Sequence, residues 1–356
     1  MNAHFGPVGE GAELFDLPAD PLEFSLECHR RGWSDGLPVI PPTPERVAAM
    51  IARSGRDPLD VVAVLPPRQG VATVELVAVS AVMAGCQPRQ FEAVVAAVTA
   101  TADPAFNLAA VNATTHPVAL LVLLSGAAAL AAGVHAGSGC FGPGFPANLA
   151  IGRALRLVQM TVGGAWPGTG DRATMGSPAK IAFCTSERED ATPWPPYHTT
   201  LGQDPDAFCV TVFPCEGPAN IQDHNSDSAE GIMKTIAGAM GHAGSNSIVG
   251  PNRTNPVLAM GPEHAATVAG DGWSRQDVQR YIFENARYPK ARLSDEFVRG
   301  MKPLYKELEE LLPIVKAPEQ LQIFVTGGPG KHCMFMHPFG GKQVCVNWTP
   351  HQPTRP

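Results

Sequence analysis

The chain has 356 residues, of which 44% are hydrophobic and 17% are charged, values typical of a folded protein with one large or two average domains. Its net charge is −7 and no basic stripe runs along it, which argues against binding to nucleic acid or to an anionic membrane. Eight cysteines without a dense spacing pattern indicate reduced thiols, and the absence of a charged and then apolar leader predicts a cytoplasmic protein.

Along the chain, strand patterns alternate with amphipathic helix patterns. Residues 1–20 mix glycine, proline and acids without periodicity, which predicts an N-terminal arm. Strands are predicted over 61–65, 118–124, 181–184, 209–213, 257–260, 321–325 and 343–347, and helices over 45–52, 74–83, 90–99, 148–158, 229–239, 275–286 and 304–312. This alternation predicts an α/β fold, with a mixed α+β fold as the alternative.

One apolar run, "PVALLVLLSGAAALAAGV" over residues 117–134, has the minimum length for a membrane span. The dipeptide Ser125-Gly126 interrupts it, and only its first half is rich in leucine and valine. We therefore expect a buried strand followed by a loop, and no membrane span.

Two segments resemble each other without gaps, "PVIPPTPERVAAM" from Pro38 and "PVLAMGPEHAATV" from Pro256. Each has the pattern of a short strand, a turn and a helix that begins with Pro-Glu. An internal duplication would give two lobes, 21–204 and 205–356, with a ligand cleft between them. Because Pro-Glu is a common helix start, convergence is the alternative explanation.

The glycine-rich stretch "GGPGKHCMFMHPFGG" over residues 327–341 is predicted to be a loop with several candidate roles. Its glycine spacing and the His332 after Lys331 do not fit a P-loop. Gly328 and Gly330 can still expose backbone N–H groups to a carboxylate or a single phosphate, with Lys331 beside them. The first interpretation is therefore an anion-binding loop.

A metal site is the second interpretation of this loop. His332, Cys333 and His337 offer two imidazoles and a thiol, which zinc accepts, but no second cluster completes a structural site. His264 or Glu263 would complete a catalytic zinc or iron site. Ordinary core packing around Met334, Phe335 and Met336 is the alternative.

The third interpretation, which we favour, makes Cys333 a nucleophile or redox thiol. Lys331, His332 and His337 surround it in the sequence, and nearby positive charge raises the thiolate fraction. His332 or His337 would then carry its proton, and His264 would act as a general acid or base.

A second thiol, Cys140, lies in another glycine-rich loop that precedes a predicted helix near Pro146. A helix N-terminus favours an anion, so the loop glycines and the first polar residues of the helix are candidate substrate-binding groups. These candidates are Gly142, Gly144, Asn148, Arg153 and Arg156. The alternatives are a simply buried Cys140 and arginines that are solvated or paired with acids of "SEREDA".

Three further segments have structural explanations that we prefer to functional ones. Ser274 and Asp277 form the pattern of a helix capping box. Asp223, His224 and Asp227 lie in a turn-rich stretch that is more typical of a loop than of a metal site. The "ATPWPPYH" segment is either a pocket wall or core, and its His198 is a lower-ranked acid or base.

The stretches "WSDGLPVIPPT", "GPGFPANLAIGRA" and "GPEHA" resemble those of an uncharacterised bacterial family, and the resemblance extends over most of the chain. That family is associated with short thiol or selenol proteins that carry a U/C-G-S-C motif. The resemblance implies thiol or redox chemistry, and supplies no catalytic residues. This chain contains only the permuted "GSGC" at residues 137–140.

Together, these patterns predict an enzyme that cleaves a bond in a small anionic metabolite by thiol and histidine chemistry, as a lyase or hydrolase. The alternatives are a thiol-dependent oxidoreductase, a metal-dependent enzyme, and a non-catalytic subunit of a larger enzyme. A homo-oligomer or a complex with a partner subunit is expected.

Overall fold

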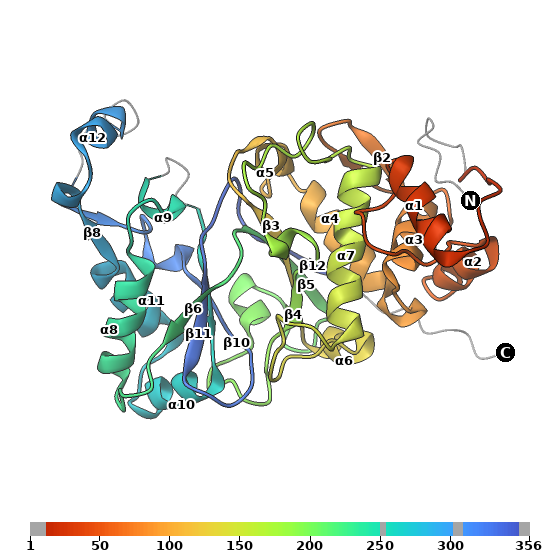
Figure 1. Ribbon diagram of the computed structural model, residues 1–356. Coiled ribbons are helices and arrows are strands. Elements are labelled where there is room, and N and C mark those ends of the chain that lie inside the picture. The colour runs from red at the N-terminus through yellow and green to blue at the C-terminus, as the bar shows by residue number, and fades with distance from the viewer. Residues whose placement is uncertain (1–11, 250–253, 302–308, 349–356) are drawn as a thin grey trace.

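Helices and strands are stacked in four layers in the computed structural model, which describes residues 12–249, 254–301 and 309–348 (Figure 1). Residues 1–11 of the predicted arm and 304–308 of a predicted helix lie outside these ranges.

The first half of the chain forms most of the first two layers. Its elements are α1 (Pro21–Arg30), α2 (Pro44–Ala52), β1 (Val61–Leu65), β2 (Gly70–Thr73), α3 (Val74–Ala84), η1 (Pro88–Gln90), α4 (Phe91–Ala102), α5 (Leu108–Ala113), β3 (Ala119–Ser125), α6 (Ala127–Ala132), α7 (Pro146–Thr161), η2 (Pro178–Lys180), β4 (Cys184–Ser186) and η3 (Tyr197–Leu201).

The second half completes the first sheet and forms the other two layers. Its elements are β5 (Cys209–Cys215), β6 (Ala219–Gln222), α8 (Ala229–Met240), α9 (Asn246–Val249), β7 (Val257–Met260), α10 (Pro262–Gly270), α11 (Arg275–Asn285), β8 (Arg287–Pro289), η4 (Lys290–Arg292), α12 (Asp295–Met301), β9 (Leu311–Pro313), η5 (Pro318–Gln320), β10 (Gln322–Val325), β11 (His332–Met336) and β12 (Val344–Asn347).

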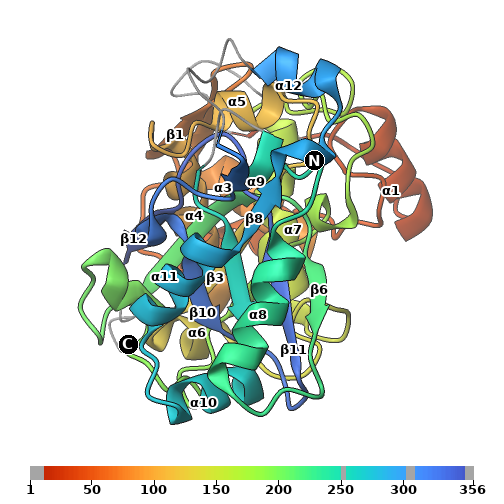
Figure 2. The same ribbon diagram turned by 90° about the vertical axis from the view of Figure 1, so that its left-hand side faces the viewer.

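Two four-stranded sheets form the middle layers. The first sheet has the order β12-β5-β3-β4 and is covered by α4 and α7, on which α3 packs, while the second has the order β10-β7-β11-β6 and is covered by α8, α10 and α11 (Figures 1 and 2). A third core lies between the sheets and contains residues of β3, β5, β7, β10 and β11. The order of layers is therefore helix, sheet, sheet, helix.

The central strands are apolar on both faces because each face meets a different core. In β3, Val122 and Leu124 belong to the core beneath the helices, while Leu121 and Leu123 belong to the core between the sheets. Successive side chains of a strand point to opposite faces, so a strand buried on both sides needs an unbroken apolar sequence. The run "ALLVLLS" of β3 meets this requirement.

Both sheets mix strand directions. The pairs β3/β4 and β7/β10 are parallel, and the other pairs within these two sheets are antiparallel. The chain ends its described part in β12, which returns to pair with β5 of the first sheet. The mixed α/β fold expected from the sequence is confirmed.

Side-chain caps and prolines define where the helices begin. Asp20 accepts hydrogen bonds from two amides of the first turn of α1, and Thr43 caps α2. Ser274 and Asp277 form the predicted capping box of α11. Such caps satisfy N–H groups that have no partner inside the helix.

Most predicted elements are confirmed, with shifts of up to three residues at their ends. The strand predicted at 181–184 is wrong in position, because Ser177 and Pro178 begin the 3₁₀ turn η2 and only Cys184–Ser186 pairs with β3. The loop predicted after Ser125 is wrong, since α6 occupies 127–132. Residues 311 and 312, predicted as helix, lie in β9, which pairs with β8.

The prediction of a continuous loop over 327–341 is also wrong. Residues 332–336 form β11, which is hydrogen-bonded between β7 and β6 in the second sheet. Flanking glycines concealed this strand, although its alternation of side chains is regular. This correction decides which way each candidate catalytic side chain points.

The predicted duplication is matched only in its helical part. Helices α2 and α10 both begin with proline and have a glutamate in the first turn. Val257–Met260 forms β7, whereas residues 38–43 form no strand. The duplication and the boundary at residue 204 stay predictions; strands β5 and β12 from beyond that boundary pair in the sheet of β3.

In the described part of the chain, none of the helices combines the length and apolar character that crossing a membrane requires. The apolar run at 117–134 is divided between β3 and α6. The strand half of that run is buried, as the sequence predicted.

We predict that Leu124→Ala lowers the free energy of unfolding by about 2–5 kcal/mol, because Leu124 is fully buried between β3 and the helices and its loss leaves a cavity. Leu130→Ala is the matched control, since Leu130 of α6 is 86% exposed and should change stability by less than about 0.5 kcal/mol. Urea unfolding measures both, and equal effects would contradict this assignment of the core.

Candidate functional site

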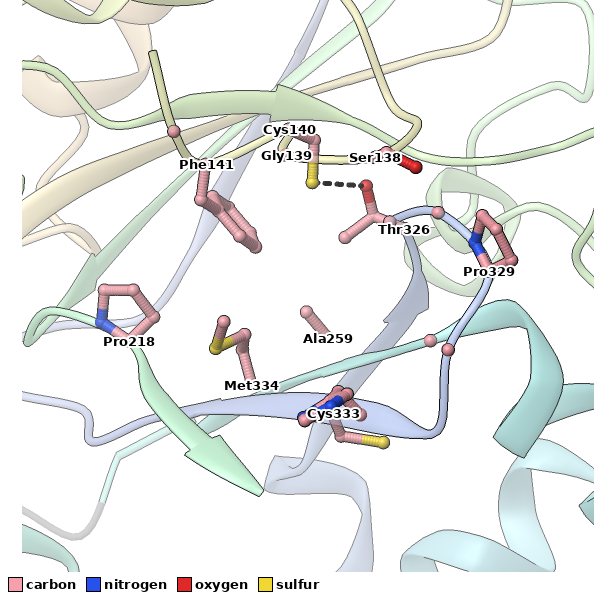
Figure 3. A pocket seen from close by; sticks show the side chains of 16 residues that line it. Ser138, Gly139, Cys140, Phe141, Pro218, Ala259, Thr326, Pro329, Cys333 and Met334 are labelled. Carbon is pink, nitrogen blue, oxygen red and sulfur yellow. Dashed lines mark hydrogen bonds between the residues drawn. The ribbon is translucent and has the colours of Figure 1, made fainter. Parts of the chain in front are cut away.

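A cavity of about 500 Å³ lies at the ends of the two middle sheets and is walled by the two glycine-rich loops (Figure 3). The residues that line it are Ser138, Gly139, Cys140, Phe141, Gly142, Pro218, Ala259, Gly261, Thr326, Gly327, Gly328, Pro329, Gly330, His332, Cys333 and Met334. Segments around residues 140, 261 and 330 therefore meet at one place. A cavity of this size suits a small metabolite.

The two loops are in direct contact, so they form one wall. The Gly327 amide donates to the carbonyl oxygen of Ala136 over 2.7 Å. A Cβ atom on Gly328 would lie 1.8 Å from Oγ of Ser138 and 2.7 Å from its Cα. Only glycine allows the backbone to approach Ser138 this closely.

Cys140 directs its thiol into the cavity, toward Thr326 (Figure 3). The distance from Thr326 Oγ1 to Cys140 Sγ is 3.5 Å. Thr326 follows β10, and its hydroxyl also lies 2.9 Å from the Ser186 carbonyl oxygen and 3.3 Å from Thr185 Oγ1. A hydroxyl carries one hydrogen and two lone pairs, so Thr326 can accept from the thiol or donate to a thiolate.

Arg188 brings positive charge close to Cys140. Its guanidinium donates to the Gly327 carbonyl oxygen over 3.1 Å and binds both carboxylate oxygens of Asp190. The hydrogen bonds that Arg188 donates to Asp190 raise the pKa of Arg188, and charge interaction with Cys140 acts in the same direction. Arg188 was absent from our candidates.

Asn148 holds the Cys140 loop and does not face the cavity, which corrects its assignment as a substrate-binding residue. It is 2% exposed, its Oδ1 accepts the His135 amide over 2.9 Å, and its Nδ2 donates to the carbonyl oxygens of His135 and Cys140 over 2.8 and 3.1 Å. A third contact reaches the Cys184 carbonyl oxygen. These bonds consume the polar atoms of Asn148 within the protein.

Cys333 turns its sulfur away from the cavity, which corrects our favoured nucleophile (Figure 3). Along β11, Cys333 and Phe335 belong to the core under the helices, and only the backbone side of Cys333 borders the cavity. Burial raises the pKa of Cys333 to about 12. An inaccessible thiol with that pKa is a poor nucleophile near neutral pH.

His264 is the partner of Cys333 and is itself fully buried. Its Nδ1 lies 3.2 Å from Cys333 Sγ, and its Nε2 lies 3.0 Å from the carbonyl oxygen of Asp223. A carbonyl oxygen can only accept, so Nε2 carries the hydrogen and Nδ1 accepts from the thiol. The pair is core structure, and His264 does not reach the cavity as the predicted acid or base.

His332 lies on the other face of β11 and lines the cavity together with Met334. Its ring Nδ1 lies 3.0 Å from Oδ1 of Asn220 on the neighbouring strand β6. Because that oxygen accepts, Nδ1 carries the hydrogen and Nε2 keeps a lone pair. His332 is therefore the one predicted histidine that the structure places on the cavity wall.

His337 lies outside the cavity, which corrects its role as a proton partner of Cys333. Its Nε2 lies 2.9 Å from Nε2 of His242, and its Nδ1 lies 3.0 Å from Oγ of Ser247. Burial first, and the charge of His242 second, lower the pKa of His337 to about 4. This ring is neutral at physiological pH.

The two arginines of α7 bind acids of the same protein and do not line the cavity, which corrects their assignment. Arg153 makes bonds of 2.8 and 2.7 Å to the Asp35 carboxylate, in the "WSDGLP" turn. Arg156 binds Asp171 over 2.9 Å, and Lys180 binds the same carboxylate. Neither partner belongs to "SEREDA", the segment that we considered.

Lys331 and Gly144 also lie away from the cavity, whereas Gly142, Gly328 and Gly330 line it. The Lys331 ammonium donates to the carbonyl oxygens of His224 and Ser226 over 3.2 and 3.1 Å. It therefore fixes the loop before α8. Its predicted role beside an anion is wrong.

The predicted metal ligands are not brought together. His264 pairs with Cys333, His332 with Asn220, and His337 with His242, while Glu263 accepts the Gly330 amide over 2.9 Å. Asp223 accepts from Ser226 and Thr235 and shapes its turn. Within residues 12–249, 254–301 and 309–348, the one group of three ligand atoms close enough to share an ion is Glu187, Glu189 and His198.

Two residues near Cys140, Thr326 of the cavity wall and Arg188, could have been found from the sequence. Thr326 is the first polar residue after an apolar strand, a common place for ligand contacts in sheets with parallel strands. Arg188 and Asp190 stand in "SERED", which we treated only as a source of acids. The approach of these segments to Cys140 depends on tertiary structure.

Comparison with protein-family models and with curated proteins finds no match to this chain.

We predict that Cys140 in the folded protein reacts with iodoacetamide at least about tenfold faster than Cys333 at pH 8, because the Cys140 thiol faces the cavity and Cys333 is a buried thiol with a raised pKa. Peptide mapping by mass spectrometry measures both rates. In denaturant the two rates should converge, and faster labelling of Cys333 in the folded chain would contradict this geometry.

The lowered pKa of His337 predicts that stability falls in acid. The folded chain has a pKa of about 4 at this ring, and an unfolded histidine titrates near pH 6.5, so the unfolded chain binds the proton more tightly. From pH 7 to pH 5 the free energy of unfolding should fall by about 2 kcal/mol through this group. His337→Gln should flatten the dependence in urea unfolding, and His116→Gln is the partly buried control. An unchanged slope in His337→Gln would contradict this explanation.

Proposed function

We propose that the protein is an enzyme that binds a small anionic molecule in the glycine-lined cavity and attacks it with the thiolate of Cys140. The observation that carries the proposal is the placement of the Cys140 thiol and His332 around one cavity, while Cys333 faces the core. The cytoplasmic location and the association with further copies or a partner subunit are part of the same proposal.

Arg188 is the group that would stabilise the reactive form of Cys140. Its positive charge interacts with Cys140, and the Thr326 hydroxyl can donate to a sulfur anion. Both interactions favour negative charge on the sulfur. The thiolate is the nucleophilic form of cysteine.

The cavity wall supports an anionic ligand with an apolar body. Phe141, Pro218 and Met334 supply an apolar surface. The amides of Gly139, Phe141 and Gly328 donate no hydrogen bond within the described residues. Free backbone amides bind carboxylate oxygens and the oxyanions that develop during acyl transfer.

In the hydrolytic form of the proposal, Sγ of Cys140 forms a bond to the acyl carbon of the substrate, and the bond to the leaving group breaks. The leaving group takes a proton from protonated His332, whose Asn220 contact orients the ring. Water then hydrolyses the thioester, returning the Cys140 thiolate and releasing the carboxylic acid. His332 accepts a proton from that water, which balances the cycle.

A thiol-dependent oxidoreductase is the second candidate. Among the described residues that line the cavity, Cys140 alone directs a thiol into it. A reductase would therefore form a mixed disulfide with a thiol from another molecule, in agreement with the thiol chemistry that the family resemblance implies. Glutathione-dependent reduction of hydroxyethyl disulfide, lost in Cys140→Ser, would favour this candidate over hydrolysis.

The expected outcome for the hydrolytic enzyme is hydrolysis of 4-nitrophenyl hydrogen succinate that Cys140→Ser reduces to background. His332→Gln should lower the rate by about 10²–10⁴-fold, the usual contribution of a proton donor or acceptor. Cys333→Ser, which keeps a donor beside His264, is the matched control and should retain the rate. Release of nitrophenolate and trapping of the acyl group on Cys140 by mass spectrometry measure these effects.

Two outcomes would contradict the proposal. Equal rates in the wild-type chain and Cys140→Ser would show that Cys140 is not the nucleophile. Equal rates with the anionic ester and the neutral 4-nitrophenyl acetate would show that the cavity does not prefer an anionic substrate.

A further inference from the structure

A second group of polar side chains lies beside the carboxyl ends of the parallel strands β3 and β4, apart from the residues that line the cavity. Glu187 directly follows β4, Glu189 comes two residues later, and His198 lies in η3. One ligand atom from each of these residues lies within 4.8 Å of the other two. The group has two carboxylates and one imidazole.

The His198 ring is oriented so that Nδ1, which has no hydrogen-bond partner, faces this group. His198 is fully buried, and its Nε2 lies 3.1 Å from the carbonyl oxygen of Pro205. Because that oxygen can only accept, Nε2 carries the hydrogen of the neutral ring, and Nδ1 is left without a hydrogen-bond partner. Nδ1 lies 3.9 Å from Oε1 of Glu189, so a lone pair faces a carboxylate.

Glu187 has a second buried atom without a hydrogen-bond partner. Its Oε2 accepts the Tyr197 amide over 2.6 Å, but no hydrogen bond reaches Oε1. Arg275 is the nearest charge, with Nη2 3.7 Å from Oε1, and it donates instead to the Pro195 carbonyl oxygen over 2.7 Å. Burial raises the pKa of Glu187 to about 7. Because Arg275 is too distant to donate a hydrogen bond, Glu187 Oε1 has an ion pair but no hydrogen bond.

Glu189 provides the open side of the group. Its Oε1 accepts the Gly126 amide over 2.5 Å, and its side chain is 32% exposed. A Cβ on Gly126 would lie 2.2 Å from the Ala207 carbonyl oxygen, and the φ of Gly126 is +66°, so a glycine is needed at this turn. The backbone therefore holds two carboxylates in place, and an ion could enter past Glu189.

We propose that Glu187, Glu189 and His198 bind a divalent transition-metal ion of the zinc or manganese class. A cation at this point would accept the lone pair of His198 Nδ1 and pair with Glu187 Oε1, the two buried atoms of this group that have no hydrogen-bond partner. The hydrogen bonds of Nε2 to Pro205 and of the carboxylates to backbone amides are the outer contacts that orient metal ligands. Imidazole and carboxylate donors suit these ions.

Charge also favours a cation here. When both carboxylates are ionised, they and the one guanidinium give the group a net negative charge, and a divalent ion would reverse this sign while it separates the carboxylates. The ion would connect the end of β4 with η3. Ser186, directly before Glu187, accepts from Thr326, so the ion would stiffen the wall behind Cys140 without entering the cavity.

The test is metal binding by the full chain, which does not depend on the proposed enzyme activity. After dialysis against chelator, the wild-type protein should bind close to one Zn²⁺ per chain in isothermal titration, and Co²⁺ should give a visible absorption band. Glu187→Gln/Glu189→Gln and His198→Asn should weaken Zn²⁺ binding by at least about tenfold, a loss that even outer contacts of a metal site produce.

The partly buried pair of His116 and Glu216, 3.3 Å apart, is the matched control. His116→Gln and Glu216→Gln should leave Zn²⁺ affinity unchanged. An anomalous difference map of wild-type crystals soaked in zinc locates the ion directly, which keeps the proposal testable where a variant fails to fold. Absence of Zn²⁺, Mn²⁺ and Co²⁺ binding by the wild-type chain, or an ion found elsewhere, would overturn the proposal.

Discussion

The arrangement of this protein depends on burying both faces of its two central sheets. Each sheet has helices on one face and the other sheet on its second face, so β3, β5, β7 and β10 are largely apolar, with Thr211 and Gln322 as buried polar exceptions. Most polar groups in such a structure gather where strands end. Thr326, Glu187 and Cys140 all lie at or beyond strand ends, or in loops beside them.

The same constraint separates the two candidate thiols. Strand β11 is part of the second sheet, so its neighbouring residues face opposite layers. His332 therefore reaches the cavity while Cys333 enters the core with His264. Consecutive residues such as His332 and Cys333 cannot act together on one substrate when they form a strand. Cys140 is not restricted in this way, because it lies in a loop that Asn148 holds by hydrogen bonds and that borders the cavity.

The sequence was sufficient for most of the helices and strands and for the α/β class, and insufficient for the side-chain pairings. Long periodic patterns such as those of α7 and β3 predicted their elements well, because burial fixes the period of apolar residues. The strand β11 was missed because glycines on both sides resemble a loop. Arg153 and Arg156 were assigned to an anion because their true partners, Asp35 and Asp171, are distant or unremarkable in the sequence. The sequence also could not show that Glu187 Oε1 and His198 Nδ1 lack hydrogen-bond partners. That property depends on which backbone groups approach these side chains in the folded protein.

The return of β12 to the first sheet has a consequence for biosynthesis. Strand β5 pairs with β3 on one side and with β12, residues 344–347, on the other. During translation the ribosome releases the N-terminal part first, yet that layer cannot complete its sheet until the second sheet and its helices have emerged. The edge of β5 therefore stays open from the time β5 emerges until residues 344–347 emerge, and nascent chains in that interval have an exposed strand edge on which a chaperone could act.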